Sequence, residues 1–141
     1  MPQLSQWGSL SLTARRGQPL VRSIRFPAGV DLTGHTVRSR VREYPDAAGV
    51  LIDMPHRAYP FADTVPASSS VMVDKTGPSP VSLILLWIPQ PTIDGLQPFA
   101  TNGTEPGAPL RKSWSCIVTP PGDLPGAWFV GDFFIFPGDP A

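Results

Sequence analysis

Three arginines at alternate positions, Arg38, Arg40 and Arg42, are the side chains in this sequence with the plainest binding chemistry. In a β-strand, alternate residues point to the same face, so the three guanidinium groups would form a row. Such a row can follow the phosphates of a nucleic acid, pair with carboxylates across strands or between subunits, or face solvent. The zero formal net charge, and the lack of aromatic residues between these arginines, disfavour nucleic acid. We expect a solvated strand face or a protein contact.

Acid–base chemistry has one candidate, because His56 follows Asp53 by three residues. A spacing of three does not place two side chains on one face of a strand, and Pro55 breaks a helix. Cys116 lies in an apolar segment near a single cation, Lys112, which predicts a buried thiol rather than a nucleophile. No nucleotide-binding or nucleophile motif is present. We expect a protein that is not an enzyme and that binds no cofactor.

Metal binding and membrane insertion are also disfavoured by composition. One cysteine and two histidines cannot complete a zinc site, and an internal disulfide needs a second cysteine. The longest apolar run, Leu83 to Ile88, is far shorter than a membrane span. Residues Met1 to Leu12 lack a basic region followed by an apolar stretch. We therefore expect synthesis in a cytoplasm, without export and without a membrane partner.

The composition favours a folded chain that is covered in part by other molecules. The 141 residues suit a single domain, residues 1 to 141. Proline (19) and glycine (13) are abundant, but a hydrophobic fraction of 41% supports a packed core. Charged residues make up 16%, below the roughly 25% of typical soluble domains. This thin charged surface predicts contacts with a partner or with further copies of the chain.

Charge is distributed unevenly along the chain. Residues 1 to 57 hold eight arginines and four carboxylates, a balance of +4, whereas residues 58 to 141 hold three cations and seven carboxylates, a balance of −4. Such an asymmetry permits head-to-tail contact between copies. The alternative is that the charges mix when the strands interleave in three dimensions.

The hydrophobic pattern has a period of two almost throughout, which is typical of β-strands. Pro80 and Pro89 bracket the apolar segment Val81 to Ile88 and favour a central strand there. No long helical stripe is present, and a proline-rich loop is expected at about residues 89 to 110. The expected strands are 9–13, 20–26, 36–44, 50–52, 71–73, 81–88, 113–119 and 127–136. These seven to nine short strands predict an all-β fold, an immunoglobulin-like antiparallel β-sandwich.

The last expected strand is rich in aromatic residues. Regular alternation would place Trp128 and Phe134 on one face and Phe129 and Phe133 on the other. A strand that is apolar on both faces is either central in its fold or covered by a neighbouring chain. We expect part of it to form an interface, together with the arginine row and the loop from Pro89 to Pro109.

Several segments resemble one known family, in the same order along the chain. They are Arg16-Gly17-Gln18, Asp31-Leu32-Thr33-Gly34 followed directly by His35 to Arg42, Val81 to Leu86 with Thr92 to Leu96, Ser113 to Thr119, and Asp123 to Phe136. The chain is similar to the small β-sandwich domains of tailed bacteriophages typified by the N-terminal domain of the baseplate upper protein. The similarity spans about Thr13 to Phe136. This sequence departs from the family in having Gln18 where the family has an acidic residue, and a longer proline-rich loop.

The tetrapeptide at residues 31 to 34 also has a local physical role. Asp31 can accept hydrogen bonds from the turn amides, Thr33 can do so through its hydroxyl, and Gly34 can adopt the positive φ that ends the turn. Gly17 marks an earlier turn, between the first two expected strands.

The resemblance implies a non-enzymatic structural protein of a tailed phage virion, a tail, baseplate or fibre-attachment subunit that is assembled in the bacterial host cytoplasm. Its partners would be other phage structural proteins and further copies of itself. One alternative is a capsid decoration, or cement, protein. A second is a carbohydrate-binding module that uses Trp87, Trp114 or Trp128, although their place in apolar strands favours the core.

Overall fold

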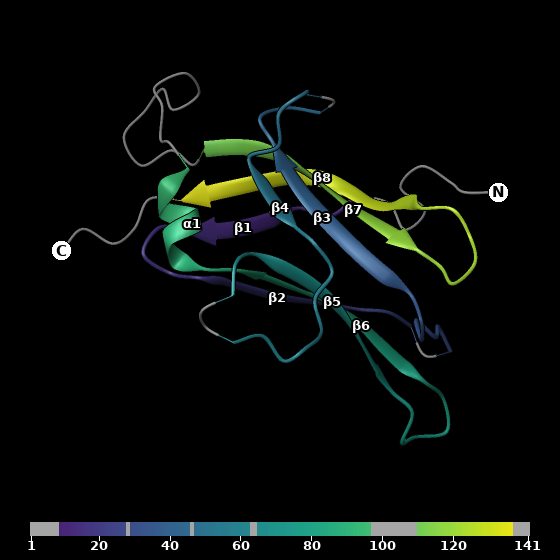
Figure 1. Ribbon diagram of the computed structural model, residues 1–141. Helices are drawn as coiled ribbons and strands as arrows, with labels where there is room; N and C mark the ends of the chain where they lie inside the picture. Colours follow the sequence, from purple (N-terminus) through teal and green to yellow (C-terminus); the bar gives the residue numbers. More distant parts are fainter. Residues whose placement is uncertain (1–8, 28, 46, 63–64, 97–109, 137–141) are drawn as a thin grey trace.

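The computed structural model describes residues 9–27, 29–45, 47–62, 65–96 and 110–136. In these ranges the chain forms eight strands and one short helix (Figure 1). The elements are β1 (Leu12–Arg15), β2 (Leu20–Arg25), β3 (Thr36–Arg42), β4 (Ile52–Met54), β5 (Ser68–Asp74), β6 (Val81–Ile88), α1 (Gln90–Gly95), β7 (Leu110–Thr119) and β8 (Gly126–Phe136).

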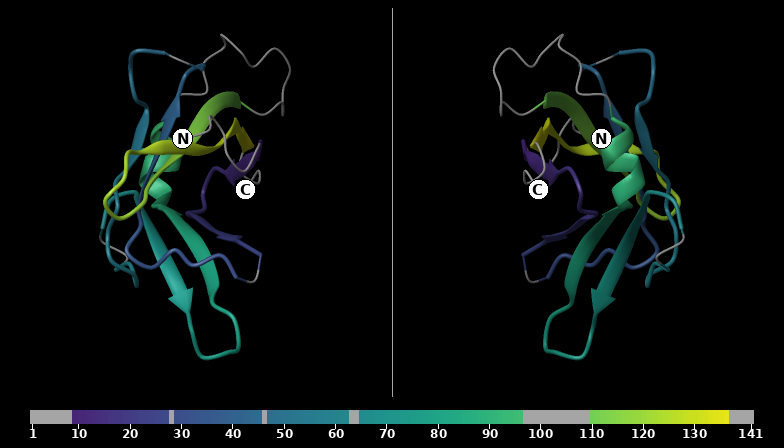
Figure 2. Two further views of the ribbon diagram at one scale, coloured as in Figure 1. Left: turned by 90° about the vertical axis from the view of Figure 1, so that its right-hand side faces the viewer. Right: turned by 90° about the vertical axis from the view of Figure 1, so that its left-hand side faces the viewer.

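The strands form two sheets that pack face to face (Figures 1 and 2). One sheet has five strands in the order β1-β8-β7-β3-β4, and the other has three in the order β2-β6-β5. All neighbours are antiparallel except β1, which runs parallel to β8. This division of the strands, with β2, β5 and β6 in one layer and β3, β4, β7 and β8 in the other, is that of an immunoglobulin variable-type sandwich. The predicted immunoglobulin-like β-sandwich is confirmed.

The core lies between the sheets and is filled by alternate residues of each strand. In β3, Val37, Ser39 and Val41 point inward and are buried, while the arginines between them point outward. The same alternation buries every second residue of β6 and β7. The largest fully buried side chains include Trp114, Phe133, Leu12, Leu32, Met54 and Ile84.

The strand β6 is central in the three-stranded sheet, as its bracketing prolines predicted, because it pairs with β2 on one side and β5 on the other. Its inward residues Ile84, Leu86 and Ile88 are fully buried. Its outward residues Leu83, Leu85 and Trp87 are half-buried. Both faces of this strand are therefore apolar, which explains the unbroken apolar run in the sequence.

A β-bulge corrects the predicted alternation in the last strand. The pairing of β7 with β8 shifts between Cys116 and Ile117, so that Cys116 pairs with Phe129 while Ile117 pairs with Ala127. The extra residue, Trp128, is buried next to the buried Phe129. A bulge inserts one residue that has no partner, and the simple period of two fails there.

The N-terminal edge of the five-stranded sheet depends on a glycine. The backbone N–H of Leu10 donates to the carbonyl of Val130 at 3.0 Å, and the indole Nε1 of Trp114 donates to the carbonyl of Leu10 at 2.7 Å. A Cβ atom at Gly131 would lie 2.0 Å from that carbonyl oxygen. Only glycine lets the two backbones approach so closely.

The helix α1 corrects part of the predicted loop at residues 89 to 110. Pro89 precedes the first turn and Pro91 lies within it, positions that proline favours because the first helical amides need no partner inside the helix. Six residues are too few to produce a visible 3.6-residue stripe. The rest of the predicted loop, residues 97 to 109, lies outside the described residues.

The β1–β2 turn holds α1 through Arg16 and Gly17. The Arg16 guanidinium donates to the carbonyls of Asp94 at 3.1 Å and Leu96 at 2.6 Å. The N–H of Gly17 donates to the Asp94 carboxylate at 2.8 Å.

Within the described part of the chain, no helix is long and apolar enough to cross a membrane.

Candidate interaction face

The arginine row lies on the outer face of the five-stranded sheet, as the period-two pattern predicted. Arg38 is exposed, and Arg40 and Arg42 are half-exposed. Across the sheet they pair with Ile117, Ser115 and Ser113 of β7 respectively. The row is therefore flanked on one side by one isoleucine and two serines and not by a second row of charges.

On its other side, the row has one counter-charge, Asp53 of β4. The Nε of Arg38 donates to Asp53 Oδ1 at 2.9 Å, and a second guanidinium nitrogen contacts Oδ2. The Nε of Arg40 lies 3.7 Å from Oδ1. The hydrogen bonds from Arg38 lower the pKa of Asp53. Cross-strand pairing, one of the alternatives for this row, thus applies to Arg38.

The other two arginines differ in their contacts. Arg42 donates to the carbonyl of Ala47 at 2.9 Å. Arg40 has a buried Nε that forms no hydrogen bond with the described residues. Strands β3 and β4 together present three guanidinium groups and one carboxylate. This part of the face carries excess positive charge.

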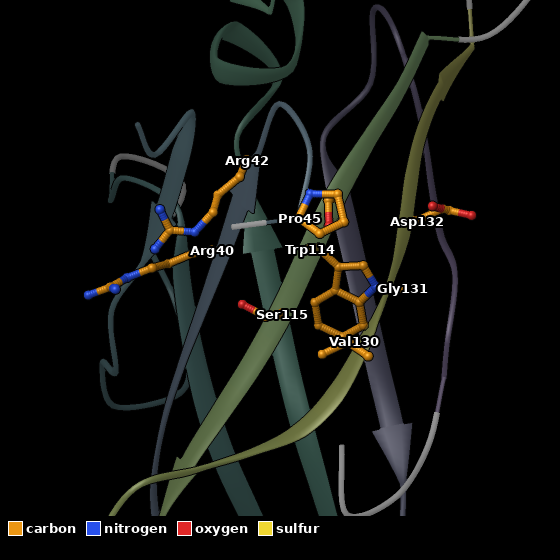
Figure 3. A pocket seen from close by; sticks show the side chains of 9 residues that line it. Arg40, Arg42, Pro45, Trp114, Ser115, Val130, Gly131 and Asp132 are labelled. Atoms are coloured by element: carbon orange, nitrogen blue, oxygen red, sulfur yellow. The ribbon is translucent and has the colours of Figure 1, made fainter. Parts of the chain in front are cut away.

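A hollow of about 370 Å³ opens beside Arg40 and Arg42 (Figure 3). It lies over β7 and extends from β3 to β8. In Figure 3 the two arginines stand on one side and Asp132 on the opposite side. Its lining consists of Arg40, Arg42, Pro45, Ser113, Trp114, Ser115, Val130, Gly131 and Asp132. The hollow thus combines a cationic wall, the small residues Ser113, Ser115 and Gly131, and three apolar side chains, Pro45, Trp114 and Val130.

The outer face also holds an ion pair that the sequence did not indicate. The Nε of Arg111 lies 3.2 Å from Asp132 Oδ1, on adjacent strands. At the same end of the sheet, the buried Lys112 pairs with Glu43. Both pairs join residues at least 21 positions apart. In the sequence Arg111 and Lys112 are simply adjacent cations in β7, which does not specify a partner for either one.

Three of the four aromatic residues expected at an interface are core residues, which corrects that expectation for them. Trp128, Phe129 and Phe133 are at most 8% exposed. The rings of Trp128 and Phe129 both lie against Phe26, with centroids 5.7 and 5.9 Å away. Phe134 alone points outward and is half-buried, between Arg111 of β7 and Thr13 of β1. The sandwich itself covers the aromatic strand that was expected to need a partner.

The structure does not pair His56 with Asp53. The Nδ1 of His56 accepts a hydrogen bond from the N–H of Val37 at 3.3 Å, and burial lowers the pKa of the imidazole. Burial also raises the pKa of the Cys116 thiol to about 12. Among the described residues, no group of three His, Cys, Asp or Glu side chains is placed to hold a metal ion.

The residues expected at turns show either side-chain hydrogen bonds to the turn or a positive φ. Asp31 Oδ1 accepts from the N–H of Thr33 at 2.9 Å and from its hydroxyl. These bonds lower the pKa of Asp31. Gly34 has a φ of +79°, and Gly17 has a φ of +85°. The turn at residues 31 to 34 leads directly into β3 and so positions the arginine row.

The tryptophans considered for carbohydrate binding are not presented on the surface as a group. Trp114 is 1% exposed and Trp128 is 8% exposed. Trp87 is half-buried, and its Nε1 donates to the carbonyl of Val65 at 3.2 Å. Stacking on a sugar needs an open aromatic face, which the first two lack.

No protein-family model matches the chain. No curated protein matches it either. One solved structure that aligns with it comes from photo-crosslinking analyses of the multimeric cell-adhesive interactions of VGSC beta subunits. The sequence identity is 14%, the TM-score is 0.34, and the alignment covers 94% of this chain and 93% of that chain. The fold assignment above rests on the strand order of the two sheets.

Proposed function

We propose that this chain is a non-enzymatic structural subunit of a tailed phage virion, in the tail, baseplate or fibre-attachment region, and that it acts through protein–protein interfaces. The observation that carries the interface part is the cationic outer face of the five-stranded sheet. On that face Arg38 and Arg40 share the Asp53 carboxylate, Arg42 donates to the Ala47 carbonyl, and an open hollow lies beside Arg40 and Arg42. Guanidinium groups suit protein interfaces, because their planar fork binds carboxylates with defined geometry.

The phage part of the proposal is supported by the ordered segments that resemble baseplate upper protein domains. Two of these segments flank the proposed face, because the turn at residues 31 to 34 leads into β3 and the segment 113 to 119 lies in β7. A charged sheet face selects partners by complementarity, and it sets the register of an assembly more than its affinity. A subunit repeated in a symmetric ring or collar uses that kind of contact.

The test is the location of the protein in phage particles. Gold-labelled antibodies against the recombinant chain are imaged by electron microscopy on particles from a lysate of the bacterium that carries the gene. We expect label at the tail or baseplate. Label over the capsid favours the decoration protein instead, and particles with neither label nor the protein by mass spectrometry contradict a virion role.

The face itself is tested by charge reversal at an exposed position. Arg38→Glu places a like charge beside Asp53, and we expect it to reduce incorporation into particles at least tenfold. Arg25→Glu on β2, an exposed position of the other sheet, makes the same change in charge and serves as the matched control. Equal incorporation of the two variants contradicts a role for this face.

A further inference from the structure

The hollow on the five-stranded sheet has the chemistry of a site for a carboxylate next to an apolar side chain. Arg40 and Arg42 form its cationic wall; the buried Nε of Arg40 makes no hydrogen bond with the described residues and lies 3.7 Å from Asp53 Oδ1, in a long ion pair. The hydroxyls of Ser113 and Ser115 belong to its floor, and Pro45 and Val130 supply apolar surface. Asp132, the acidic residue in the lining, is already paired with Arg111. A volume of about 370 Å³ suits two side chains rather than a large ligand.

A segment with the complementary chemistry lies at the turn between β7 and β8. Asp123 and Leu124 are adjacent there, and Leu124 is 70% exposed. The described carboxylates Asp31, Glu43, Asp53 and Asp132 all pair with cations.

The described carboxylates without an ion pair are Asp74, Asp94 and Asp123, and Asp123 has the most free acceptor capacity. Asp74 accepts two hydrogen bonds from Thr76, and Asp94 accepts from Gly17 and Gln90. Asp123 accepts one, from the N–H of Leu124 at 2.7 Å. An exposed acid beside an exposed leucine therefore protrudes from one end of the sheet.

The turn of a chain cannot reach the hollow of the same chain. Ser113 and Asp132, which line the hollow, pair near the start of β7, whereas Val118 and Gly126 pair just before the turn. Five residues of extended strand span roughly 17 Å. The hollow thus lies over the middle of β7 and β8, whereas the turn lies beyond their ends, where Figure 1 shows the loop that joins these two strands.

We propose that the Asp123–Leu124 turn of one copy of this chain docks into the Arg40–Arg42 hollow of the next copy. The carboxylate of Asp123 receives hydrogen bonds from the Arg40 guanidinium, and Leu124 packs against Pro45 and Val130. Because the two surfaces differ, the contact is head-to-tail, and repeated contacts close into a ring or extend as a filament. This inference rests on the proposed function, since it specifies how the subunit assembles with itself.

The experiment uses two variants that each remove one half of the contact. Asp123→Lys removes the acid of the turn, and Arg40→Glu reverses the charge of the hollow. Mass is measured by light scattering and analytical ultracentrifugation across a range of protein concentrations, at low and high salt. Asp74→Lys makes the same change in charge at another exposed turn and is the control. Melting curves of all variants establish that each one is folded, and Ser115→Glu replaces Arg40→Glu if the latter does not fold.

The expected result has three parts. Wild type and Asp74→Lys associate, and high salt weakens the association. Each single variant in the contact stays near the monomer mass of 15.2 kDa, with an association constant at least tenfold lower. An equimolar mixture of Asp123→Lys and Arg40→Glu associates again, because one intact turn and one intact hollow remain and the two substituted surfaces carry opposite charges.

Other results overturn the inference. Association of either single variant at the strength of wild type places the self-contact elsewhere. A monomeric wild type at all concentrations, or a mixture that stays monomeric while wild type associates, also contradicts it. Failure here is separate from failure of the proposed function, because a protein that is monomeric in solution but labelled on virions retains the virion role and loses only this contact.

Discussion

The outer faces of the two sheets have opposite chemistry. On the five-stranded sheet the outward residues Arg40, Arg42, Ser115 and Asp132 line an open hollow. On the three-stranded sheet the central strand turns Leu83, Leu85 and Trp87 outward, all half-buried. One face is polar and accessible, and the other is apolar and partly covered.

The chain after β4 accounts for part of that cover. Arg57 donates from its backbone to the carbonyl of Ser69 at 2.8 Å and from its side chain to Ser68 Oγ at 2.9 Å. The carbonyl of Val65 accepts from the Trp87 indole. This segment therefore binds the edge and outer face of the three-stranded sheet. The apolar outer face of β6 is thus partly covered within the molecule, whereas the charged face of the other sheet stays open.

The largest expected effect separates the two sides of β8. Phe133→Ala empties a position that is fully buried between the sheets, and we expect a loss of about 3–5 kcal/mol in the free energy of unfolding. Phe134→Ala, on the outer side of the next residue, is the matched control and should cost about 1 kcal/mol. Urea denaturation measures both, and similar losses would refute the assignment of Phe133 to the core.

The next effect compares the outer faces directly. Leu85→Ala removes half-buried apolar surface from the three-stranded sheet, and we expect it to cost roughly 1–2 kcal/mol. Val130→Ala, on the outer face of the other sheet, should cost less, about 0.5 kcal/mol, because its side chain is smaller and 38% exposed. Thermal unfolding of both variants tests the difference. The reverse order would mean that the five-stranded face is the better packed of the two.

A smaller effect comes from the carboxylate of the charged face. The folded-state pKa of Asp53 lies below its ordinary value of 3.8, chiefly through hydrogen bonds from Arg38. Its stabilising contribution is therefore present above pH 3.8 and is lost as pH falls through the lower folded value. Asp53→Asn should cost at most about 1 kcal/mol at pH 7, because solvent screens the pair. Unfolding curves between pH 2 and pH 6 should show a shallower decline for the variant, and an unchanged slope would contradict this pairing.

The smallest effect concerns His56, which contacts one strand of each sheet. His56 accepts a hydrogen bond from Val37 of β3, and its backbone bridges to Ser69 of β5. Burial lowers its folded pKa below 6.5, so stability is complete above pH 6.5 and declines as pH falls through the lower folded value. The midpoint of urea unfolding between pH 8 and pH 5 measures this decline. His56→Gln should remove this decline with pH, and the control His35→Gln should leave it unchanged. The opposite result would show that the decline does not come from His56.

Local sequence patterns were enough to predict most of the strands and the face on which most of their residues lie. Alternation over residues 36 to 42 placed the arginines outward and Val37 and Val41 inward, because the side-chain period of a strand is fixed by its backbone. Two prolines confined the apolar run at 81 to 88 to one central strand, and the turn after Thr119 produced the β7–β8 hairpin. These features depend on residues that are close in sequence.

Contacts between residues of different strands could not be predicted in this way. The bulge opposite Cys116 buries Trp128 beside Phe129. The pairing of β3 with β4 places Asp53 next to Arg38, so that Asp53 pairs with Arg38 and not with His56. Sheet register is set by the packing of many residues that are distant in sequence, so it cannot be predicted from the alternation within one strand. For the same reason the hollow, whose lining comes from β3, β7, β8 and Pro45, has no counterpart in any one stretch of sequence.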